Sequence, residues 1–320
     1  MSLKSSSRYG FVIGLVIGLV CLGLAIRSVD LAELLGTFKK LEFIYLFAAL
    51  IFAFSHAFVM AAKWQLFLRP LEPQKFWNCF WSVRLGFFFN AVLPAKLGEG
   101  IRIWFLQRNG GLKFSEGIGA LVADRLIDFI ALMAVFYFAM NFIMMDSAWF
   151  PKEILLLVFL GIGGVIWALN FLPVTKGPLW IQRFMQFLQR VRRGFESLKQ
   201  PRTLIPAFLF SVLGWMIHLG ILVVLAKGLN LDLGWPELAV VIAAVTLASS
   251  IPSAPSSLGT FEFAAVFVLT KFFKVPAEES LALALMYHFV QLLITWGVGF
   301  IGYVRYHSTL MPEIRRLKGD

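Results

Sequence analysis

The feature that most constrains this fold is a Pro-x-x-Leu-Gly run that interrupts an apolar segment twice. The first copy lies in residues 90–102, which read Asn-Ala-Val-Leu-Pro-Ala-Lys-Leu-Gly-Glu-Gly-Ile-Arg. The second lies in residues 251–262 and is likewise followed closely by a glutamate. Proline removes a backbone donor and glycine is conformationally permissive, so each run should end one short helix and begin another. Paired interruptions of this kind in two halves of a chain indicate a transporter binding site.

Composition places the chain in a membrane. Of its 320 residues, 59% are hydrophobic and 15% are charged, and a soluble protein of this length cannot bury that much apolar surface. The net charge is +11. In a membrane protein an excess of Lys and Arg usually marks cytoplasmic loops, so we do not expect nucleic-acid binding. Cys21 and Cys79 lie far apart in apolar stretches, so neither a disulfide nor a cysteine-ligated metal is expected.

We predict an all-α polytopic membrane protein with about six full spans and two re-entrant, broken-helix hairpins. Residues 1–320 then form a single integral membrane domain. The predicted spans are residues 9–26, 43–62, 115–145, 154–172, 204–226 and 281–304, and the predicted hairpins are residues 76–106 and 238–273. If each broken segment instead made two complete crossings, the number of spans would change but the side of the largest basic loop would not.

Basic residues set the predicted orientation. The segments on one side of this arrangement hold most of the Lys and Arg, with the most basic loop at residues 173–203. The excess of positive charge on the cytoplasmic side predicts that both termini are cytoplasmic. The two hairpins then enter from opposite sides, and the halves, approximately 42–145 and 204–304, form inverted repeats.

Charged residues gather around the first break, and ionisable groups inside a membrane are functional candidates by default. They are Arg84, Lys96, Glu99, Arg102, Glu116, Asp124, Arg125 and Asp128. One interpretation is an internal ion-pair cluster that joins Arg125 to Asp128 and Arg102 to Glu99 or Glu116. The other is that arginines here, Arg84 among them, complete their coordination with a lipid phosphate, which suits the planar guanidinium fork. The sequence leaves both open.

The second break is rich in hydroxyls rather than charges. A helix that begins near Gly259 would present free N–H groups and a positive dipole end to an anionic head group. Capping by Ser257 or Thr260, with Glu262 as a dipole partner, explains the same residues without a ligand. We interpret the lone histidines of the spans, His56 and His218 among them, as hydrogen-bonded packing residues.

The candidate site is assigned to substrate binding, with no catalytic residue. It comprises Arg84, Asn90, Pro94, Lys96, Gly98, Glu99, Arg102, Asp124, Arg125, Asp128, Pro252, Pro255, Ser256, Ser257, Gly259 and Glu262. Nucleotide-binding loops, nucleophile elbows and metal-ligand spacings are not found, so we expect neither a cofactor nor a metal. Transport would therefore run on a gradient, or on synthesis at one leaflet and removal at the other.

Three ordered motifs resemble the flippase-like transmembrane family, whose best-known member is the membrane region of lysylphosphatidylglycerol synthase. The pattern Leu-Pro-[Ala/Gly]-x-x-Gly-Glu-x-x-Arg is matched by residues 93–102, Arg-x-x-Asp by Arg125 and Asp128, and Pro-x-x-Pro-x-x-Leu-Gly-x-x-Glu by residues 252–262. The resemblance covers nearly the whole chain. It implies a bacterial or archaeal inner-membrane protein that moves, or helps to move, a lipid with a polar head between leaflets.

Two departures from the family pattern limit what the resemblance implies. The second motif usually carries Gly-Gly where this chain has Ser256 and Ser257, so hydroxyl contacts would replace close backbone approach. The soluble aminoacyl-transfer domain of the synthase is not found in these residues. We therefore do not expect the two-domain enzyme, and its lipid is not assumed to be the substrate.

Three functions follow from these patterns. The first is a lipid flippase with an anionic, polar-headed lipid as its substrate. The alternative is a non-transporting subunit that presents lipid to a glycosyltransferase or lipid synthase, with residues 173–203 as the docking surface. An intramembrane enzyme that uses Glu99 or Glu262 as a general base ranks last, because no paired nucleophile or metal accompanies either carboxylate. The oligomeric state stays open.

Overall fold

The computed structural model describes residues 3–27, 29–93, 96–143, 188–189, 191–251 and 253–318. Every regular element in these ranges is a helix. The helices are α1 (Leu3–Ile26), α2 (Leu31–Lys39), α3 (Phe43–Leu68), α4 (Phe76–Val92), α5 (Gly98–Gly110), α6 (Phe114–Met140), α9 (Glu196–Lys199), α10 (Pro201–Gly228), α11 (Trp235–Ser250), the 3-10 turn η4 (Pro255–Ser257), α12 (Thr260–Lys271) and α13 (Ala277–Lys318). The all-α class predicted from the sequence is confirmed.

Three helices are long and apolar enough to cross a membrane: Phe43–Leu68, Pro201–Gly228 and Ala277–Ser308. The bent pair Gly14–Ile26 and Leu31–Lys39 would add a fourth. α6 is of similar length, but Asp124, Arg125 and Asp128 interrupt its apolar run, so it is not among these three helices. The predicted span 154–172 lies outside the described residues. Six full spans therefore stay a prediction.

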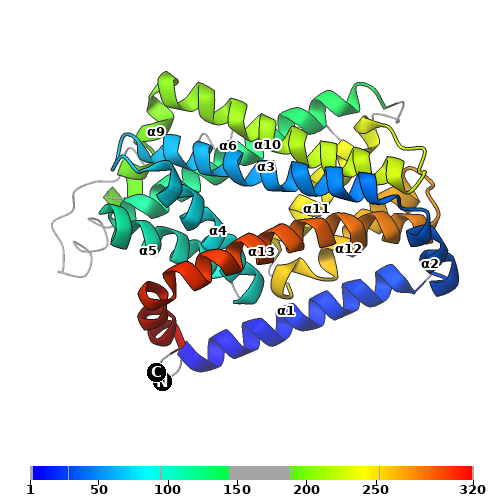
Figure 1. The fold of residues 1–320 in the computed structure, drawn as a ribbon, viewed down its shortest axis with the longest axis horizontal. Helices are drawn as coiled ribbons and strands as arrows, with labels where there is room; N and C mark the ends of the chain where they lie inside the picture. Colours follow the sequence, from blue (N-terminus) through cyan, green and yellow to red (C-terminus); the bar gives the residue numbers. More distant parts are fainter. Residues whose placement is uncertain are drawn as a thin grey trace.

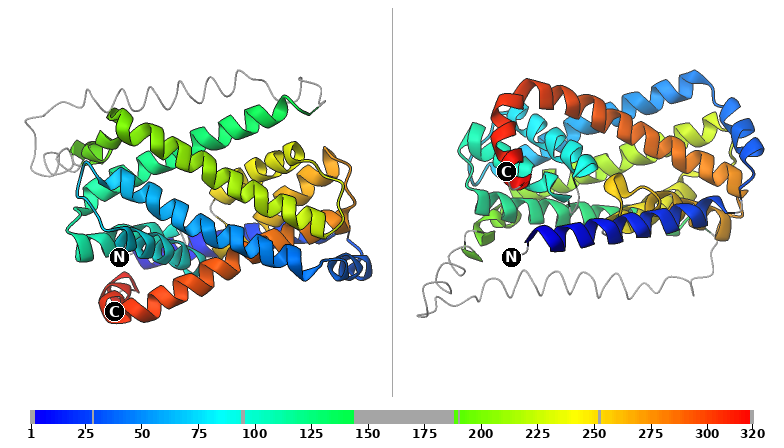
Figure 2. Two further views of the ribbon diagram at one scale, coloured as in Figure 1. Left: turned by 45° about the horizontal axis from the view of Figure 1, so that its top comes forward. Right: turned by 90° about the horizontal axis from the view of Figure 1, so that it is seen from below.

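Each of the two breaks joins a pair of short helices that pack against each other, α4 with α5 and α11 with α12 (Figure 1). Both pairs lie beside α13, which contacts α4 and α12. α3 packs along α10, α13 contacts both of them, and α1 lies along the outside against α12 (Figure 1). Figure 2 shows the same arrangement from two further directions, and its right-hand view again shows α1 at the edge of the bundle.

Two separate hydrophobic clusters hold the two hairpins. Trp64 and Phe105 are buried in the cluster around α4 and α5. Leu222 and Leu283 are buried in the cluster around α11 and α12. Each hairpin therefore packs in its own hydrophobic cluster, and the long helices α3, α10 and α13 contribute residues to both clusters.

Large apolar side chains also cover the outside of the long helices. Phe43 and Phe47 on α3, and Ile205 and Leu209 on α10, are exposed and lie four residues apart on their helix. Residues spaced by four share one face of a helix, so each pair forms an apolar stripe that points away from the bundle. Exposed apolar surface of this kind marks contact with lipid.

Several helix boundaries differ from the prediction. The 173–203 segment was expected to be a loop, but its described end is partly helical, with α9 inside it. α10 begins at Pro201 rather than at 204, since the fixed φ of proline suits the first helical position. The last helix continues past 304 to Lys318, with a departure from helical geometry at Tyr306.

Candidate functional site

The first break separates α4 from α5. Leu93, which follows α4, has an extended backbone, and α5 begins at Gly98. Between them Lys96 has a left-handed backbone with φ 55°, a conformation that costs energy for any residue with a side chain. The motif residues Pro94 and Ala95 lie outside the described residues. The helix therefore stops and restarts at the predicted position.

Gly98 allows α5 to lie directly on α4. A methyl group at Gly98 would lie 2.5 Å from the backbone nitrogen of Asn90 and 2.7 Å from its Oδ1. The Asn90 side chain also donates a hydrogen bond to Glu99 Oε1 at 3.4 Å. Three predicted site residues from the two sides of the break thus meet where the helices approach most closely.

Lys63 lies at the centre of the charges near this break. α3 continues past it, and its side chain is fully buried. The Lys63 ammonium lies 2.8 Å from Asp124 Oδ1 and also pairs with Asp128, whose Oδ1 accepts a hydrogen bond from Ser211 at 2.8 Å. The predicted end of this span at residue 62 is wrong, because the helix continues to Leu68. The apolar run that continues through residues 64–68 was the signal that could have found it.

Two arginines complete the ion pairs on the hairpin side. Arg102 is buried, donates to Asp124 Oδ2 at 3.2 Å, and lies 3.9 Å above the centre of the Trp64 ring. Arg125 donates to Glu99 Oε1 at 2.7 Å. The pairings predicted from the sequence, Arg102 with Glu99 and Arg125 with Asp128, are present only as longer contacts of 3.8 Å. The interpretation as an ion-pair cluster is thus largely correct, but the shorter pairs are Arg102 with Asp124 and Arg125 with Glu99.

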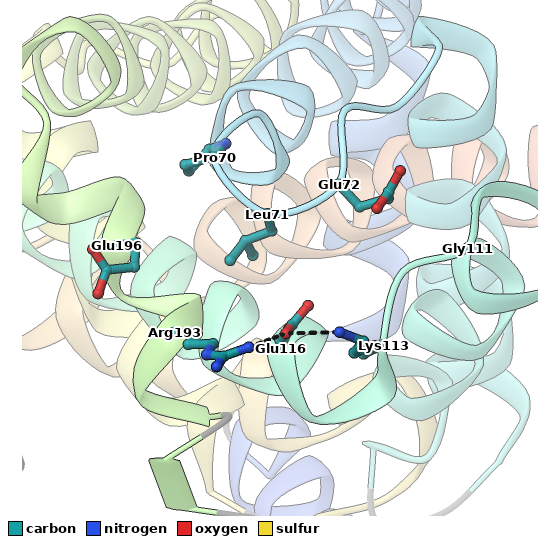
Figure 3. A pocket seen from close by; sticks show the side chains of 8 residues that line it. All are labelled: Pro70, Leu71, Glu72, Gly111, Lys113, Glu116, Arg193 and Glu196. Atoms are coloured by element: carbon teal, nitrogen blue, oxygen red, sulfur yellow. Dashed lines mark ion pairs between the residues drawn. The ribbon is translucent and has the colours of Figure 1, made fainter.

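Glu116 does not belong to this site. It pairs with Lys113 at 3.8 Å and Arg193 at 3.7 Å, and all three line a pocket of about 240 Å³ at the start of α6 (Figure 3). The expected alternative pairing of Arg102 with Glu116 is therefore wrong. Arg102 reaches α6 at Asp124 instead, about 12 Å further along the helix.

Arg84 is the unusual member of the group. It is 3% exposed, its Nε and Nη2 have no hydrogen-bond partner, and its guanidinium lies 5.0 Å from the centre of the Phe87 ring. None of the ion pairs found among the described residues includes it. We define the charged cluster as Lys63, Arg84, Glu99, Arg102, Asp124, Arg125 and Asp128. The cluster thus has four cations and three carboxylates. Arg84 is the cation that makes no ion pair with any described residue.

The second break contains the turn η4, which begins at Pro255; Pro252 lies outside the described residues. Ser256 and Ser257 both have φ 59°, a region that glycine adopts without steric cost. The Gly-Gly that the second motif usually carries at these two positions suits this backbone geometry. Ser256 Oγ donates to the carbonyl oxygen of Ala91 at 3.5 Å, so the turns of the two hairpins touch.

The start of α12 is already capped. Glu262 Oε2 accepts a hydrogen bond from the backbone N–H of Gly259 at 2.7 Å, and Glu262 Oε1 lies 2.5 Å from His288 Nδ1. Gly259 also lies directly against Gly18 of α1. Of the two interpretations of this helix end, capping accounts for these contacts.

The hydroxyls of the second break mostly bind within the break. Thr260 Oγ1 lies 3.1 Å from Ser253 Oγ and donates to the Ser257 carbonyl at 3.0 Å. Ser257 in turn donates to the carbonyl of Ser249 at 3.5 Å. These contacts stabilise the turn itself, so the second break offers fewer free polar groups than the sequence suggested.

A network of polar side chains lies between α3, α10 and α13, and the site predicted from the sequence did not include it. The rings of His56 and His218 are 4.4 Å apart between centroids. His218 Nδ1 lies 2.8 Å from the Tyr287 hydroxyl and 2.7 Å from Gln291 Nε2. We call His56, His218, Tyr287 and Gln291 the histidine network.

Comparison with known proteins gives this arrangement a family. A family described as the lysylphosphatidylglycerol synthase TM region matches residues 11–299. The chain belongs to this family. A relative from Methanocaldococcus jannaschii, the "UPF0104 membrane protein MJ1078", is 26% identical over 211 residues, which cover 63% of this chain and 87% of the relative.

Membership of the lysylphosphatidylglycerol synthase transmembrane-region family confirms the resemblance seen in the sequence. The matched range includes both breaks, the charged cluster and the histidine network. Together with the apolar helices, it identifies a multi-pass membrane protein. In the described part of the chain, no group of three or more His, Cys, Asp and Glu side chains is arranged to hold a metal ion.

Proposed function

We propose that this protein moves a lipid with an anionic, phosphate-bearing head group between the leaflets of the inner membrane, without covalent chemistry. The observation that carries the proposal is Arg84, a buried guanidinium with two unpartnered nitrogens and no ion pair among the described residues. An uncompensated buried charge is costly, and it persists where a ligand supplies the missing charge.

A phosphate fits this position better than other anions. Its oxygens match the planar fork of a guanidinium, and the Nε and Nη2 atoms that lack partners lie on one edge of that fork. Arg125, with 41% of its side chain exposed, adds a second cation that is accessible at the same cluster. The acyl chains of such a lipid would stay in the bilayer while the head group enters between the helices.

The arrangement of the hairpins supports movement between leaflets. Each hairpin packs in its own hydrophobic cluster, and the two meet at the Ser256–Ala91 contact. We propose that the halves are inverted repeats, that both hairpins are re-entrant and that both termini are cytoplasmic. Rocking of one half against the other about that contact would then expose the site alternately to the two sides.

The experiment is leaflet exchange in vesicles. Purified protein is placed in phosphatidylcholine vesicles that contain phosphatidylglycerol with a fluorescent label on an acyl chain, and external dithionite bleaches the outer leaflet. We expect nearly complete bleaching with the wild type and bleaching of the outer leaflet alone with Arg84→Gln. Arg108→Gln is the matched control, since Arg108 is exposed at the end of α5.

Folding is checked in the same samples by thermal unfolding. An Arg84→Gln variant that folds and exchanges lipid as fast as the wild type would contradict the role of Arg84. Folded wild type that exchanges no lipid would contradict the transport function and favour a subunit that presents lipid to an enzyme.

A further inference from the structure

We propose that Phe87 is a positioning residue of the head-group site, and that its ring joins Arg84 and Arg125 into one site for the phosphate of a lipid. The inference rests on the proposed function, because it takes the ligand of Arg84 to be a phosphate-bearing head group. It adds the residue that holds both arginines, and it makes Arg125 the entrance to the site.

The first argument is that one ring contacts both arginines. The guanidinium carbon of Arg84 lies 5.0 Å from the centre of the Phe87 ring, and that of Arg125 lies 5.9 Å from the same centre. Both distances are within the range over which an aromatic face attracts a cation, about 6 Å. Arg84 belongs to α4 and Arg125 to α6, so the ring brings together cations from two helices.

The second argument is what such a contact leaves free. An aromatic ring attracts a guanidinium group without accepting a conventional hydrogen bond from it, so the N–H groups stay available. Arg84 is in this condition, since its Nε and Nη2 have no partner while its guanidinium lies over the Phe87 ring. A carboxylate in place of the ring would neutralise Arg84 and compete with a phosphate. Phe87 therefore holds the cation without occupying its binding positions.

The third argument is exposure, which falls from Arg125 to Arg84. The side chain of Arg125 is 41% exposed, Phe87 is half-buried, and Arg84 is 3% exposed. An anion that arrives from outside the bundle therefore reaches Arg125 first. Phe87 is the contact that this outer cation shares with the inner one.

The fourth argument is the position of this group on α4. Arg84, Phe87 and Ala91 are spaced by three and four residues, so they lie along one face of the helix. At the end of this row the carbonyl oxygen of Ala91 accepts the hydrogen bond from Ser256 of the second break. Asn90, which packs on α5, lies on a different face. The row with the inner cation thus leads to the contact between the two hairpins.

The test changes the charge distribution of the ring and leaves its shape nearly constant. Phenylalanine analogues with one, two or three ring fluorine atoms are introduced at Phe87 by stop-codon suppression, because each fluorine weakens the attraction of the ring for a cation. Dihexanoyl phosphatidylglycerol is then titrated calorimetrically into the purified full chain in neutral detergent. We expect the affinity to fall stepwise with the number of fluorine atoms, by about two- to thirtyfold in total.

Ordinary substitutions give a second measurement, with folding checked by thermal unfolding. Phe87→Leu removes the aromatic face and should weaken binding at least as much as the most fluorinated ring. Phe87→Tyr keeps the face and should bind nearly as tightly as the wild type. Phe88→Leu is the matched control and should leave the affinity unchanged, because Phe88 is the next residue of α4 and its ring contacts Tyr303.

A combined variant tests whether Phe87 acts through the arginines. With Arg125→Gln one of the two cations at the ring is lost, so the effect of fluorination should become smaller than in the wild type. An undiminished effect would overturn the shared use of the ring by the two arginines.

The outcomes separate this inference from the proposed function. Equal affinity across the fluorinated series would overturn it even if Phe87→Leu does not fold, and so would the absence of any binding by the wild type. A loss for Phe87→Tyr as large as that for Phe87→Leu would also overturn it, since shape alone would then decide. A stepwise fall in a protein that exchanges no lipid in vesicles would support the role of Phe87 while contradicting transport.

Discussion

The ammonium group of Lys63 lies 2.8 Å from the carboxylate of Asp124, and both side chains are completely buried. This contact joins α3 to α6 behind the first hairpin, and the same lysine also pairs with Asp128. One cation therefore contacts carboxylates on two successive turns of α6. Ion pairs of this kind hold the charged cluster in place, while Arg84, a member of the same cluster, has no such partner among the described residues.

Replacing Lys63 should destabilise the fold strongly. Lys63→Met leaves two carboxylates short of a partner, one of them buried beside Arg102, and breaking a buried pair in this way costs about 3 kcal/mol or more. The measurement is denaturation of the purified protein in mixed detergent and dodecyl sulfate. Lys75→Met, at an exposed lysine before α4, should change the stability little. Equal stability of the two variants would contradict a central role for Lys63.

The close approach of α5 to α4 predicts opposite effects for two glycines of the same helix. Gly98→Ala places a methyl group against Asn90 and should destabilise the protein by about 1 to 3 kcal/mol. Gly100 has nothing within 4 Å of the position that an added methyl group would take, so Gly100→Ala should stabilise α5 slightly. Thermal unfolding of both variants checks the sign of each change. A stabilised Gly98→Ala protein would show that α5 does not lie directly on α4.

The left-handed turn at the second break predicts a stabilising substitution. Ser256→Gly removes the steric cost of φ 59° and should raise the free energy of unfolding by about 0.5 to 1 kcal/mol. The hydrogen bond lost, to Ala91, is a long one of 3.5 Å. Ser250→Gly, in the last turn of α11, should have the opposite sign, because glycine weakens a helix. A loss of stability for Ser256→Gly would mean that its hydroxyl contributes more than its backbone geometry costs.

The packing of α1 on the second break predicts a change in accessibility. A methyl group on Gly18 would lie 2.7 Å from Ala254 Cβ and from the Leu258 carbonyl oxygen, so Gly18→Ala should push α1 away from the turn. Labelling with maleimide at a Ser253→Cys position, in a background without the two native cysteines, should then become faster.

Gly23→Ala is the matched control for this measurement. Gly23 lies on the same helix with nothing within 4 Å of an added methyl group, so labelling should be unchanged. Equal labelling rates for the two glycine variants would show that α1 does not cover the second break.

Much of the helical architecture could be predicted from the chain alone, because apolar runs and Pro-Gly interruptions act locally. The end of α4, the start of α12 and the length of α3 up to residue 62 follow from such runs. The errors arose where a polar residue stood inside an apolar run. Lys63 was interpreted as the end of a span, although the apolar pattern resumes after it.

Partners across the fold were less predictable than helices. The sequence grouped the charged residues near the first break correctly, but it paired them by their spacing along the chain. In the structure Arg102 pairs with Asp124 and Arg125 with Glu99, which are contacts between different helices. The histidine network was missed for the same reason, since its members come from three helices and share no local pattern.

The sequence by itself determined the membrane class, the family and the two places where helices break, because hydropathy and backbone restrictions act over a few neighbouring residues. Only the tertiary structure decided which charges are neutralised and which are not. That outcome depends on distances between side chains of separate helices, and Coulomb attraction falls with distance in space rather than along the chain. Packing thus gives Lys63 two carboxylates and leaves Arg84, on the neighbouring α4, without one in the described part of the protein.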